Sequence, residues 1–578
     1  MTLNESSKNL TSAEPVRTVD LLVIGAGPAG MAAAIFAKLR GLDVVIIEKS
    51  EMIGGTASTS AGTLWIPENS QGKQIGDKDS ITQAAAYLDS LIAAHTHRTD
   101  RQRDVYFSTG VEAIDVLQSM TEVKFLPCGE HPDYHAKAGA AVRGRAIVPA
   151  PFDARMLGRD FERVRPPIDE FMIFGGMMVG KMDIPRLLGR FQSLGNFIYS
   201  ARLFLRYLTD RLRFSRGTRL VMGNALVARM YHSLLKLGVR PEFGTCLGEL
   251  LVENGRVTGA TVAGPSGTAR ISARKGVILA TGGFAHNAGY RERLMPQPTP
   301  KFSLASTANQ GEGIAAAEAL GARISETENG SGGFWTPVSV TRRKDGTQGL
   351  FPHLSLDRAK PGLIAVNRAG RRFCNEADSY HDFVEAMYRS NDPDSAIPTW
   401  LICDGTFIRK YGLGHIYPGT TDLAPFLTSG YLVHGETPEA LAKKLGIDAA
   451  GLEATLSRYN EQAARGVDED FHKGHSALNR FNGDPQVKPN PCLAPVGTKN
   501  VYAMAVWPAE IACSAGISTD EDARVVDGDE NPIPGLYACG NDMASVMGDS
   551  YPGPGTTLGP AVVFAYRAVN AAARERYD

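Results

Sequence analysis

Hydrophobic and polar positions alternate most clearly near the amino end of the chain, where they predict a strand, a helix and a second strand. An apolar run covers 21–24, helical spacing of apolar residues covers 31–39, and a second apolar run covers 44–47. Two buried strands joined by a helix are typical of a βαβ unit with a parallel sheet. Further helices are predicted over 81–94, 104–120 and 561–573.

The turn between the first strand and helix carries a nucleotide-binding pattern, Gly-Ala-Gly-Pro-Ala-Gly. Gly25 permits the tight turn, Gly27 lets the backbone approach a pyrophosphate, and Gly30 allows the helix to pack closely on the strand. Glu48 ends the second strand, where its carboxylate can accept a hydrogen bond from a ribose 2′-OH. A carboxylate at this position disfavours a 2′-phosphate, so the motif predicts either FAD or NAD.

Two later segments favour FAD. A Gly-Gly-Thr run lies at 54–56, and a Gly-Leu-Tyr-Ala-Cys-Gly-Asn run lies at 535–541. In flavoproteins similar to glutathione reductase and fumarate reductase, a late run of this kind closes the flavin site, and a run like 276–283 forms the strand beneath the nucleotide. The succinate dehydrogenase type carries a histidine for covalent attachment, and 56–62 holds none. We therefore predict non-covalent FAD.

The resemblance to these flavoproteins implies a set of cofactor-binding residues that comes from both ends of the chain. The predicted residues are Gly25, Gly27, Pro28, Ala29, Gly30, Glu48, Lys49, Gly55, Thr56, Ser60, Ala61, Gly62, Ala280, Gly282, Gly283, Gly540, Asn541, Thr557 and Leu558.

Length and motif order predict the domain organisation. A chain of 578 residues exceeds what one core supports. We expect an α/β fold with a Rossmann-like FAD-binding domain of the glutathione-reductase type and an inserted α+β substrate domain. The expected parts are a disordered leader over 1–18, a first FAD-binding part over 19–284 with a helical insertion at about 168–220, a substrate domain over 285–505, and a second FAD-binding part over 506–578.

Composition restricts the partners and the compartment. The net charge of −1 disfavours nucleic acid as a partner. The seven cysteines are scattered without a Cys-x-x-Cys pair, which favours a reducing compartment, the cytoplasm. No apolar run reaches the roughly 20 residues of a membrane-spanning helix. His131 with His135, and His472 with His475, lack a third ligand at metal spacing, so we predict no metal site.

The segment 196–214 reads as a basic amphipathic helix. Arg202, Arg206 and Arg213 fall on one face, with apolar residues on the other. Such a helix can lie in a membrane interface, which would make the protein peripherally membrane-associated, or can pack its apolar face onto its own domain.

Taken together, the motifs resemble those of the 3-ketosteroid Δ1-dehydrogenases of the fumarate-reductase-type flavoprotein superfamily. The resemblance covers nearly the whole chain. The segments that carry it are 54–67, 131–135, 144–153, 216–230, 367–380 and 550–560, the last reading Ser-Tyr-Pro-Gly-Pro-Gly-Thr-Thr-Leu-Gly-Pro.

This resemblance implies removal of hydrogens from C1 and C2 of a 3-keto steroid ring. Tyr551 and the backbone N–H of Gly555 match the pair that holds the C3 oxygen as an oxyanion hole. Tyr380 matches the base that takes the C2 proton, and Tyr134 matches the tyrosine that donates to its phenolate. An unperturbed tyrosine has a pKa of about 10, so this base needs its anion stabilised. Flavin N5 accepts the C1 hydride. An electron acceptor such as a quinone is implied but not specified.

Several alternatives stay open. A 4,5-desaturating ketosteroid dehydrogenase or a related cyclic-ketone dehydrogenase would use similar chemistry, and the loop 510–516 departs from the family pattern. A fumarate- or urocanate-like ene-reductase would need cationic clamps, for which Arg371 and Arg372 are candidates. We expect these arginines to pair instead with Glu376 or Asp378 on a strand surface. A non-catalytic flavin-binding protein is the remaining alternative.

Overall fold

The computed structural model describes residues 16–92, 97–180, 183–326, 330–343, 345–390 and 396–575. Residues 1–15 of the predicted leader lie outside this range, as do residues 93 and 94 of the helix predicted over 81–94. β1 (Val16–Ile24) already begins at Val16. Residues 16–18 of the predicted leader are therefore part of a strand.

The first sheet binds the two ends of the chain together. Its strand order is β10-β2-β1-β13-β12-β11, and β24 adds to β13 and pairs with β23. β1 runs parallel to both β2 and β13, and β24 runs parallel to β13 with Val277 opposite Leu536. The other strands of this sheet are β2 (Val44–Glu48), β10 (Glu242–Phe243), β11 (Cys246–Glu253), β12 (Arg256–Gly264), β13 (Gly267–Leu279), β23 (Arg524–Val526) and β24 (Pro532–Ala538).

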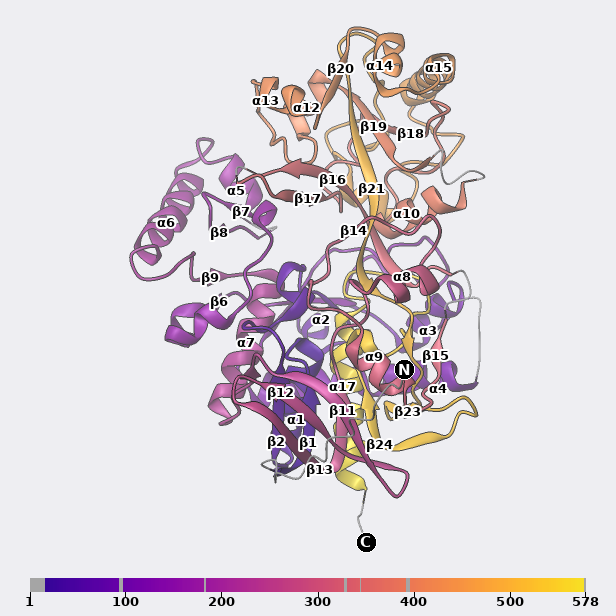
Figure 1. Cartoon of the computed structure of the whole chain (residues 1–578). Coiled ribbons are helices and arrows are strands. Elements are labelled where there is room, and N and C mark those ends of the chain that lie inside the picture. Colours follow the sequence, from indigo (N-terminus) through magenta and orange to yellow (C-terminus); the bar gives the residue numbers. More distant parts are fainter. Residues whose placement is uncertain are drawn as a thin grey trace, which may run out of the picture.

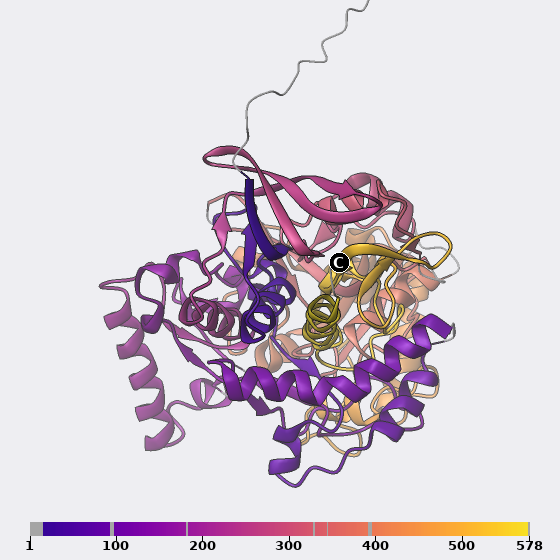
Figure 2. The ribbon, with the colours of Figure 1, turned by 90° about the horizontal axis from the view of Figure 1, so that it is seen from below.

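Two helices pack side by side on this sheet. α1 (Pro28–Leu39) buries ten consecutive residues, from Pro28 to Ala37, five of them alanines, so it can lie close to the strands. α17 (Leu558–Arg574) is the predicted last helix and packs against α1 through Phe36 and Tyr566, whose ring centroids lie 4.9 Å apart. Figure 2 shows α4 (His97–Met120) crossing close to α17. The helix predicted from 104 therefore begins earlier, at His97, and the one predicted over 81–94 is α3 (Ile81–Asp89).

A second sheet forms the upper half of the molecule in Figure 1. Its order is β17-β16-β21-β19-β18, with β14 and β20 also paired to β21. β21 (Val501–Cys513) runs from this upper half towards the first sheet, and the boundary proposed at 505/506 falls inside it. The other strands are β14 (Phe302–Ser303), β16 (Gly333–Arg342), β17 (Gln348–Pro352), β18 (Leu363–Val366), β19 (Thr399–Asp404) and β20 (Val433–Gly435).

Helices cover the second sheet and close its own core. α15 (Ala449–Arg465) places Leu452, Leu456 and Tyr459 in one buried cluster with residues of β18 and β19. α10 (Tyr380–Arg389) packs on β16 and carries Tyr380 at its first position. This sheet and its helices are the inserted α+β unit that the motif order predicts.

A small lobe lies at the edge of the molecule, beside the outer end of β16 and β17 (Figure 1). It contains β7 (Met172–Ile173), β8 (Met177–Met178), α5 (Ile184–Leu188) and α6 (Leu194–Asp210). The helix predicted over 196–214 is therefore α6, which ends at Asp210. Its apolar face does not pack onto the domain, because Leu205 is 60% exposed and Leu208 is 45% exposed.

The remaining elements are short or connect the two sheets. They are β3 (Leu64–Trp65), β4 (Phe125–Pro127), β5 (Ala146–Pro149), β6 (Phe152–Asp153), β9 (Arg219–Leu220), β15 (Ile324–Ser325), β22 (Gly516–Ile517), α2 (Ser70–Gln74), α7 (Met222–Lys236), α8 (Ala288–Leu294), α9 (Glu312–Glu318), α12 (Gly405–Tyr411), α13 (Ala424–Thr428), α14 (Pro438–Leu445) and α16 (Ala477–Asn482), with 3-10 helices at Gly55–Thr59, Ala154–Arg163, Asp169–Phe171 and Gly540–Asp542. Within the described ranges, no helix is both long and apolar enough to cross a membrane.

Candidate active site

A cavity of about 190 Å³ follows the carboxyl ends of the parallel strands of the first sheet. It collects most of the predicted cofactor residues, from positions far apart in the chain. Those that line it are Gly25, Gly27, Pro28, Ala29, Glu48, Lys49, Gly55, Thr56, Ser60, Ala280, Gly282, Gly540, Asn541, Thr557 and Leu558. Ala61 and Gly62 line a neighbouring cavity instead.

The other two predicted residues, Gly30 and Gly283, do not line either cavity. A Cβ on Gly30 would lie 1.9 Å from the carbonyl oxygen of Gly25, which agrees with close packing of helix on strand. The Gly283 amide donates to Asp542 Oδ1 at 2.8 Å, behind the cavity wall.

The turn at the start of α1 fits a pyrophosphate. Gly25 has a φ of 103°, and a Cβ there would lie 2.3 Å from Ala280 O, so no other residue fits. Gly27 faces open space, with no atom within 4 Å of the Cβ position. No side chain caps the amino end of α1, which leaves its first amides free to bind an anion.

Glu48 is fixed at the position expected for a ribose. Its Oε2 accepts a hydrogen bond from Ala26 N–H and its Oε1 accepts one from Ser50 N–H, both at 2.9 Å. Each carboxylate oxygen retains a further lone pair for a ligand hydroxyl. The residues present therefore fit the nucleotide half of FAD.

A second cavity of about 260 Å³ adjoins the first and shares Thr56, Ser60 and Tyr551 with it. Its wall is largely apolar, and Tyr134, Tyr380 and Gly555 also line it. Further wall residues include Ile168, Phe171, Leu304, Pro352, Leu354, Leu478 and Ile511. Among the described residues, no arginine or lysine lines this cavity.

The three predicted tyrosines meet in this cavity. Tyr134 OH donates to Tyr380 OH at 3.3 Å, across 246 positions of sequence. The ring of Tyr134 stacks on that of Tyr551 at 5.6 Å, and the ring of Tyr380 meets Tyr551 edge-on at 5.3 Å. The structure thus brings together one phenol from each of three distant segments.

The loop that carries Tyr134 is tied to the segment that carries Tyr551. Pro552 O accepts hydrogen bonds from Tyr134 N–H at 2.8 Å and from Tyr87 OH at 2.7 Å. The preceding residue, Asp133, forms a buried ion pair with Arg145 at 2.6 Å and accepts from Trp65 Nε1 at 2.8 Å. These contacts fix the distance between the two phenols.

Tyr380 and Gly555 both lie at helix amino ends. Ser379 caps α10 by accepting from Asp382 N–H at 3.1 Å, so Tyr380 occupies the first helical position. Gly555 has a φ of 103° and precedes α17, and a Cβ on it would lie 2.5 Å from the backbone of Leu64. Within the described chain nothing accepts a hydrogen bond from Gly555 N–H. This amide is available to a ligand in the cavity.

Burial dominates the electrostatics of the cavity. It raises the pKa of Tyr134, Tyr380 and Tyr551 above that of a free tyrosine. Burial also raises the pKa of Asp378, another wall residue, to about 7. A tyrosine that acts as a base here therefore needs an environment that stabilises its anion.

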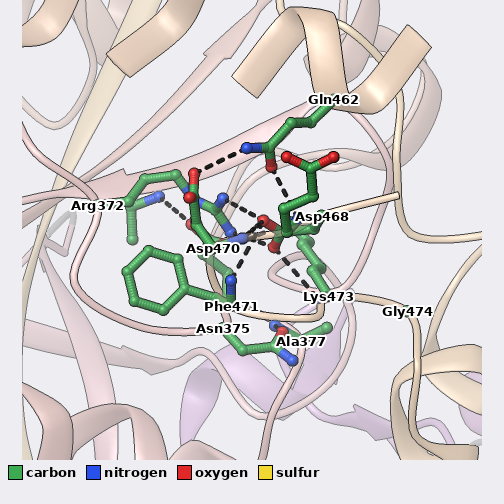
Figure 3. A network of polar contacts seen from close by, with 12 residues as sticks. Arg372, Asn375, Ala377, Gln462, Asp468, Asp470, Phe471, Lys473 and Gly474 are labelled. Atoms are coloured by element: carbon green, nitrogen blue, oxygen red, sulfur yellow. Dashed lines mark hydrogen bonds and ion pairs between the residues drawn. The ribbon is translucent and has the colours of Figure 1, made fainter. Parts of the chain in front are cut away.

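The loop before Tyr380 is held by a buried cluster of charges (Figure 3). Arg372 binds Glu376 at 2.8 Å and Asp468 at 2.9 Å, and its side chain is only 4% exposed. Lys473 donates to Leu363 O at 2.7 Å and lies 3.3 Å from Glu376. The expected pairing of Arg372 with Glu376 is present. Its expected place on a strand surface is wrong, because the cluster is internal, whereas Arg371 is exposed.

Several wall residues were missed by the sequence analysis. Asp378, His131, Leu354 and Asn482 line the second cavity, and the first is also lined by Arg165, Thr245, Cys246, Asn309 and Glu312. Asp378 and His131 lie within the motifs 367–380 and 131–135, so their nearness to Tyr380 and Tyr134 was a usable signal. The others carry no local pattern.

The fold and the two adjoining cavities define a flavin-dependent oxidoreductase. A model of the FAD binding domain family matches residues 20–558. The chain belongs to this family, and the predicted FAD, fold class and enzyme class are confirmed.

Curated relatives and a solved structure match almost the whole chain. A 4-oxocyclohex-2-ene-1-carboxylate 5-dehydrogenase of Sinomonas cyclohexanicum is 39% identical, over 96% of this chain and 94% of the relative. A 3-oxosteroid 1-dehydrogenase of Mycobacterium tuberculosis is 36% identical, over 96% and 98%. The crystal structure of 3-ketosteroid Δ1-dehydrogenase from Sterolibacterium denitrificans with 1,4-androstadiene-3,17-dione has a TM-score of 0.88 at 36% identity, covering 97% of this chain and all of that one.

Proposed function

We propose that this protein desaturates the C1–C2 bond of a 3-ketosteroid with FAD as oxidant, as a step of steroid catabolism. The observation that carries the proposal is the convergence of three phenols and a free amide on an apolar cavity beside the cofactor cavity. Relatives named 3-oxosteroid 1-dehydrogenase support it.

The roles follow from the chemistry of an enolisable ketone. Tyr551 OH and Gly555 N–H would hold the C3 oxygen, so that negative charge developing there is stabilised. Tyr380 would take the C2 proton and Tyr134 would donate to its phenolate, through the hydroxyl contact of 3.3 Å. Bound FAD would supply the two-electron acceptance that desaturation requires.

A second candidate is a cyclic ketone that carries a carboxylate, because the relative at 39% identity is named for such a substrate. The cavity wall argues against it. In the described part of that wall no arginine or lysine could pair with a carboxylate, whereas Asp378 would repel one when ionised. The same argument disfavours a fumarate- or urocanate-like reductase. A neutral, apolar substrate fits the cavity better.

The test is a comparison of substrates on the purified, FAD-loaded protein. We expect androst-4-ene-3,17-dione to be converted to its 1,4-diene and 4-oxocyclohex-2-ene-1-carboxylate to be a poor substrate. Mass spectrometry gives the loss of two hydrogens, and the new vinyl protons at C1 and C2 identify the product. A parallel reaction with 5α-androstane-3,17-dione, in which both bonds are saturated, distinguishes 1,2- from 4,5-desaturation. Efficient turnover of the carboxylate alone would replace the steroid by the second candidate.

We also propose that the lobe containing α6 rests on an anionic membrane surface inside the cell. Phe191, Leu194 and Leu212 are 80%, 74% and 83% exposed. Arg186, Arg190, Arg202, Arg211 and Arg213 are exposed beside them, while Asp183 and Asp210 are buried in ion pairs. Apolar side chains flanked by cations are the pattern of an interfacial helix. All seven cysteines are free, which favours a reducing compartment.

Sedimentation with vesicles tests this lobe. We expect binding to phosphatidylserine vesicles that weakens with salt, and loss of binding in Leu205→Ser/Leu208→Ser. Val252→Ser is the matched control, because Val252 is 46% exposed on the edge of the first sheet. Equal sedimentation of both variants, or no salt-sensitive binding by the wild type, would contradict membrane contact.

A further inference from the structure

A buried arginine, Arg358, lies behind the wall of the second cavity and is 2% exposed. Its Nε donates to His353 O at 2.8 Å, and another guanidinium nitrogen donates to Leu354 O at 3.1 Å. The third nitrogen donates to Glu376 O at 2.8 Å and to Asp378 O at 3.2 Å. Leu354 and Asp378 both line the cavity. One side chain therefore ties two walls together through four backbone carbonyls.

The charge of Arg358 is not cancelled by a direct ion pair with any described residue. The adjacent carboxylate, Asp357, is bound to His353 at 2.6 Å, and Glu376 is bound to Arg372 at 2.8 Å. The guanidinium lies over the ring of Phe383, on α10, at 4.9 Å from the centroid. A buried cation held by carbonyls and an aromatic face keeps a positive potential around it.

That potential reaches Tyr380, at the start of α10. Burial raises the pKa of Tyr380 most and the neighbouring Tyr134 raises it further, whereas a hydrogen bond with Tyr551 and the positive charge of Arg358 lower it. The amino end of α10 contributes a potential of the same sign, because helix amino ends favour anions. Both effects stabilise the phenolate relative to the phenol.

We propose that Arg358 is the positioning residue of the Tyr380 base: it fixes the Glu376–Asp378 backbone and supplies the positive charge that stabilises the Tyr380 phenolate. This rests on the proposed function, in which Tyr380 takes a proton. Arg358 acts through Tyr380 and not on the substrate.

Other titratable groups surround Tyr380 and set the size of the effect. On the adjoining loops and on α10 they are Tyr134, His131, His135, Asp357, Asp378, Tyr551, His381, Asp382 and Glu385. Asp378, with its pKa raised to about 7, opposes Arg358 when it ionises. Tyr134 and Tyr551 are neutral hydroxyls, because burial raises the pKa of both. Arg358 is thus the buried cation that acts on this base.

The experiment separates charge from structure with two substitutions in the FAD-loaded protein. Arg358→Gln removes the charge and most of the carbonyl contacts, whereas Arg358→Lys loses most of the contacts but keeps the charge. Arg371→Gln is the matched control, since Arg371 is an exposed arginine on the segment 367–380 that leads to Tyr380. The ionisation of Tyr380 is read from the ultraviolet absorbance of tyrosinate, as the difference between each protein and its Tyr380→Phe counterpart.

We expect Arg358→Gln to raise the pKa of Tyr380 by about one unit or more and to move the pH profile of kcat/KM to alkaline pH by the same amount. Arg358→Lys should restore most of that shift, and Arg371→Gln should cause none. Equal losses of activity in the Gln and Lys variants, without a change in pKa, would reduce Arg358 to a structural role and overturn the proposal.

If Arg358→Gln does not fold, Asp378→Asn tests the electrostatic effect instead, because it removes the carboxylate that opposes the charge of Arg358. Removing the carboxylate beside Arg358 should lower the pKa of Tyr380, and an unchanged pKa would overturn the proposal. The tyrosinate measurement needs no turnover. If the variants show these pKa shifts but no ketosteroid bleaches the flavin of the wild-type protein, the proposed function is rejected. The electrostatic role of Arg358 then still stands.

Discussion

Among single residues, the three phenols of the second cavity differ in what holds them in place. Tyr380 is fixed by its helix and by the loop that Arg358 binds. Tyr134 is fixed through its own backbone N–H and through Asp133. Tyr551 is held by three ring contacts: it stacks on Tyr134 and meets Tyr380 and Phe334 edge-on, with ring centroids 5.2 to 5.6 Å away. The hydroxyl positions are therefore set by separate contacts, and each can be tested alone.

Tyr380→Phe and Tyr551→Phe should each lower turnover by about 10²–10³-fold, because each removes a transition-state interaction worth roughly 3–4 kcal/mol. Both variants should stay folded and keep FAD. The control is Tyr459→Phe: Tyr459 is as buried, but its hydroxyl has no hydrogen-bond partner in the described chain. Steady-state rates decide, and near-normal turnover in both active-site variants would contradict the assigned roles.

Asp378 predicts a pH dependence of stability. Its pKa is raised by burial to about 7 in the folded protein, against about 3.9 when unfolded. Between these values the folded state binds the extra proton, so stability is lost as the pH rises through this window. Asp378→Asn removes that penalty and should be more stable than the wild type by roughly 4 kcal/mol at about pH 8, with little difference at about pH 4. Thermal melting across pH measures it, and a difference that does not change with pH would contradict the raised pKa.

How far sequence predicts these residues depends on local pattern. Gly25 and Gly27 could be predicted because a phosphate turn imposes a fixed spacing. Tyr380 and Tyr551 could be recognised only through family motifs, since nothing in the spacing of the 18 tyrosines singles them out. Arg358 has no signal at all, because its partners are backbone carbonyls that only the fold brings together.

Among elements, the loop 128–145 depends on a buried ion pair for its position. Arg145 binds Asp133 at 2.6 Å and Asp79 at 3.0 Å, with 2% of its side chain exposed. Arg145→Met leaves both carboxylates buried without a cation, so the free energy of unfolding should fall by about 3–5 kcal/mol and turnover should fall with it. Arg163→Met is the control: Arg163 pairs with Glu51, and their side chains are 42% and 68% exposed, so its loss should cost about 1 kcal/mol or less. Equal destabilisation in denaturant titrations would contradict this account.

The helix at 196–214 shows where element prediction stops. Periodicity found the helix but not its end, because Arg211 is already a capping residue of α6. Periodicity also could not tell which face meets solvent. The charged Arg206 pairs with Asp153 of the domain at 2.9 Å, while the apolar Leu212 is 83% exposed. In ordinary packing the apolar side chain would face the domain and the charged one the solvent. Burial depends on neighbours that the helix sequence does not contain.

At the scale of the whole molecule, the cofactor cavity joins segments from both ends of the chain, Gly25–Pro28 and Gly540–Leu558. Removing FAD should therefore loosen both ends together, because a ligand that binds only the folded state stabilises all that it contacts. Hydrogen exchange of the apo and FAD-loaded forms should differ in these two segments and little in β18 and β19. Loss of protection at one end alone would show that FAD does not span them.

The central claim is that the phenols and the cofactor act together on a neutral ketone, and one measurement tests it most directly. Androst-4-ene-3,17-dione is mixed anaerobically with the FAD-loaded protein while the visible flavin band is followed, and the product is identified by mass spectrometry. The account predicts rapid bleaching and a steroid that has lost two hydrogens, with bleaching slowed by about 10²–10³-fold in Tyr380→Phe. A flavin that dithionite reduces but the steroid does not would contradict it.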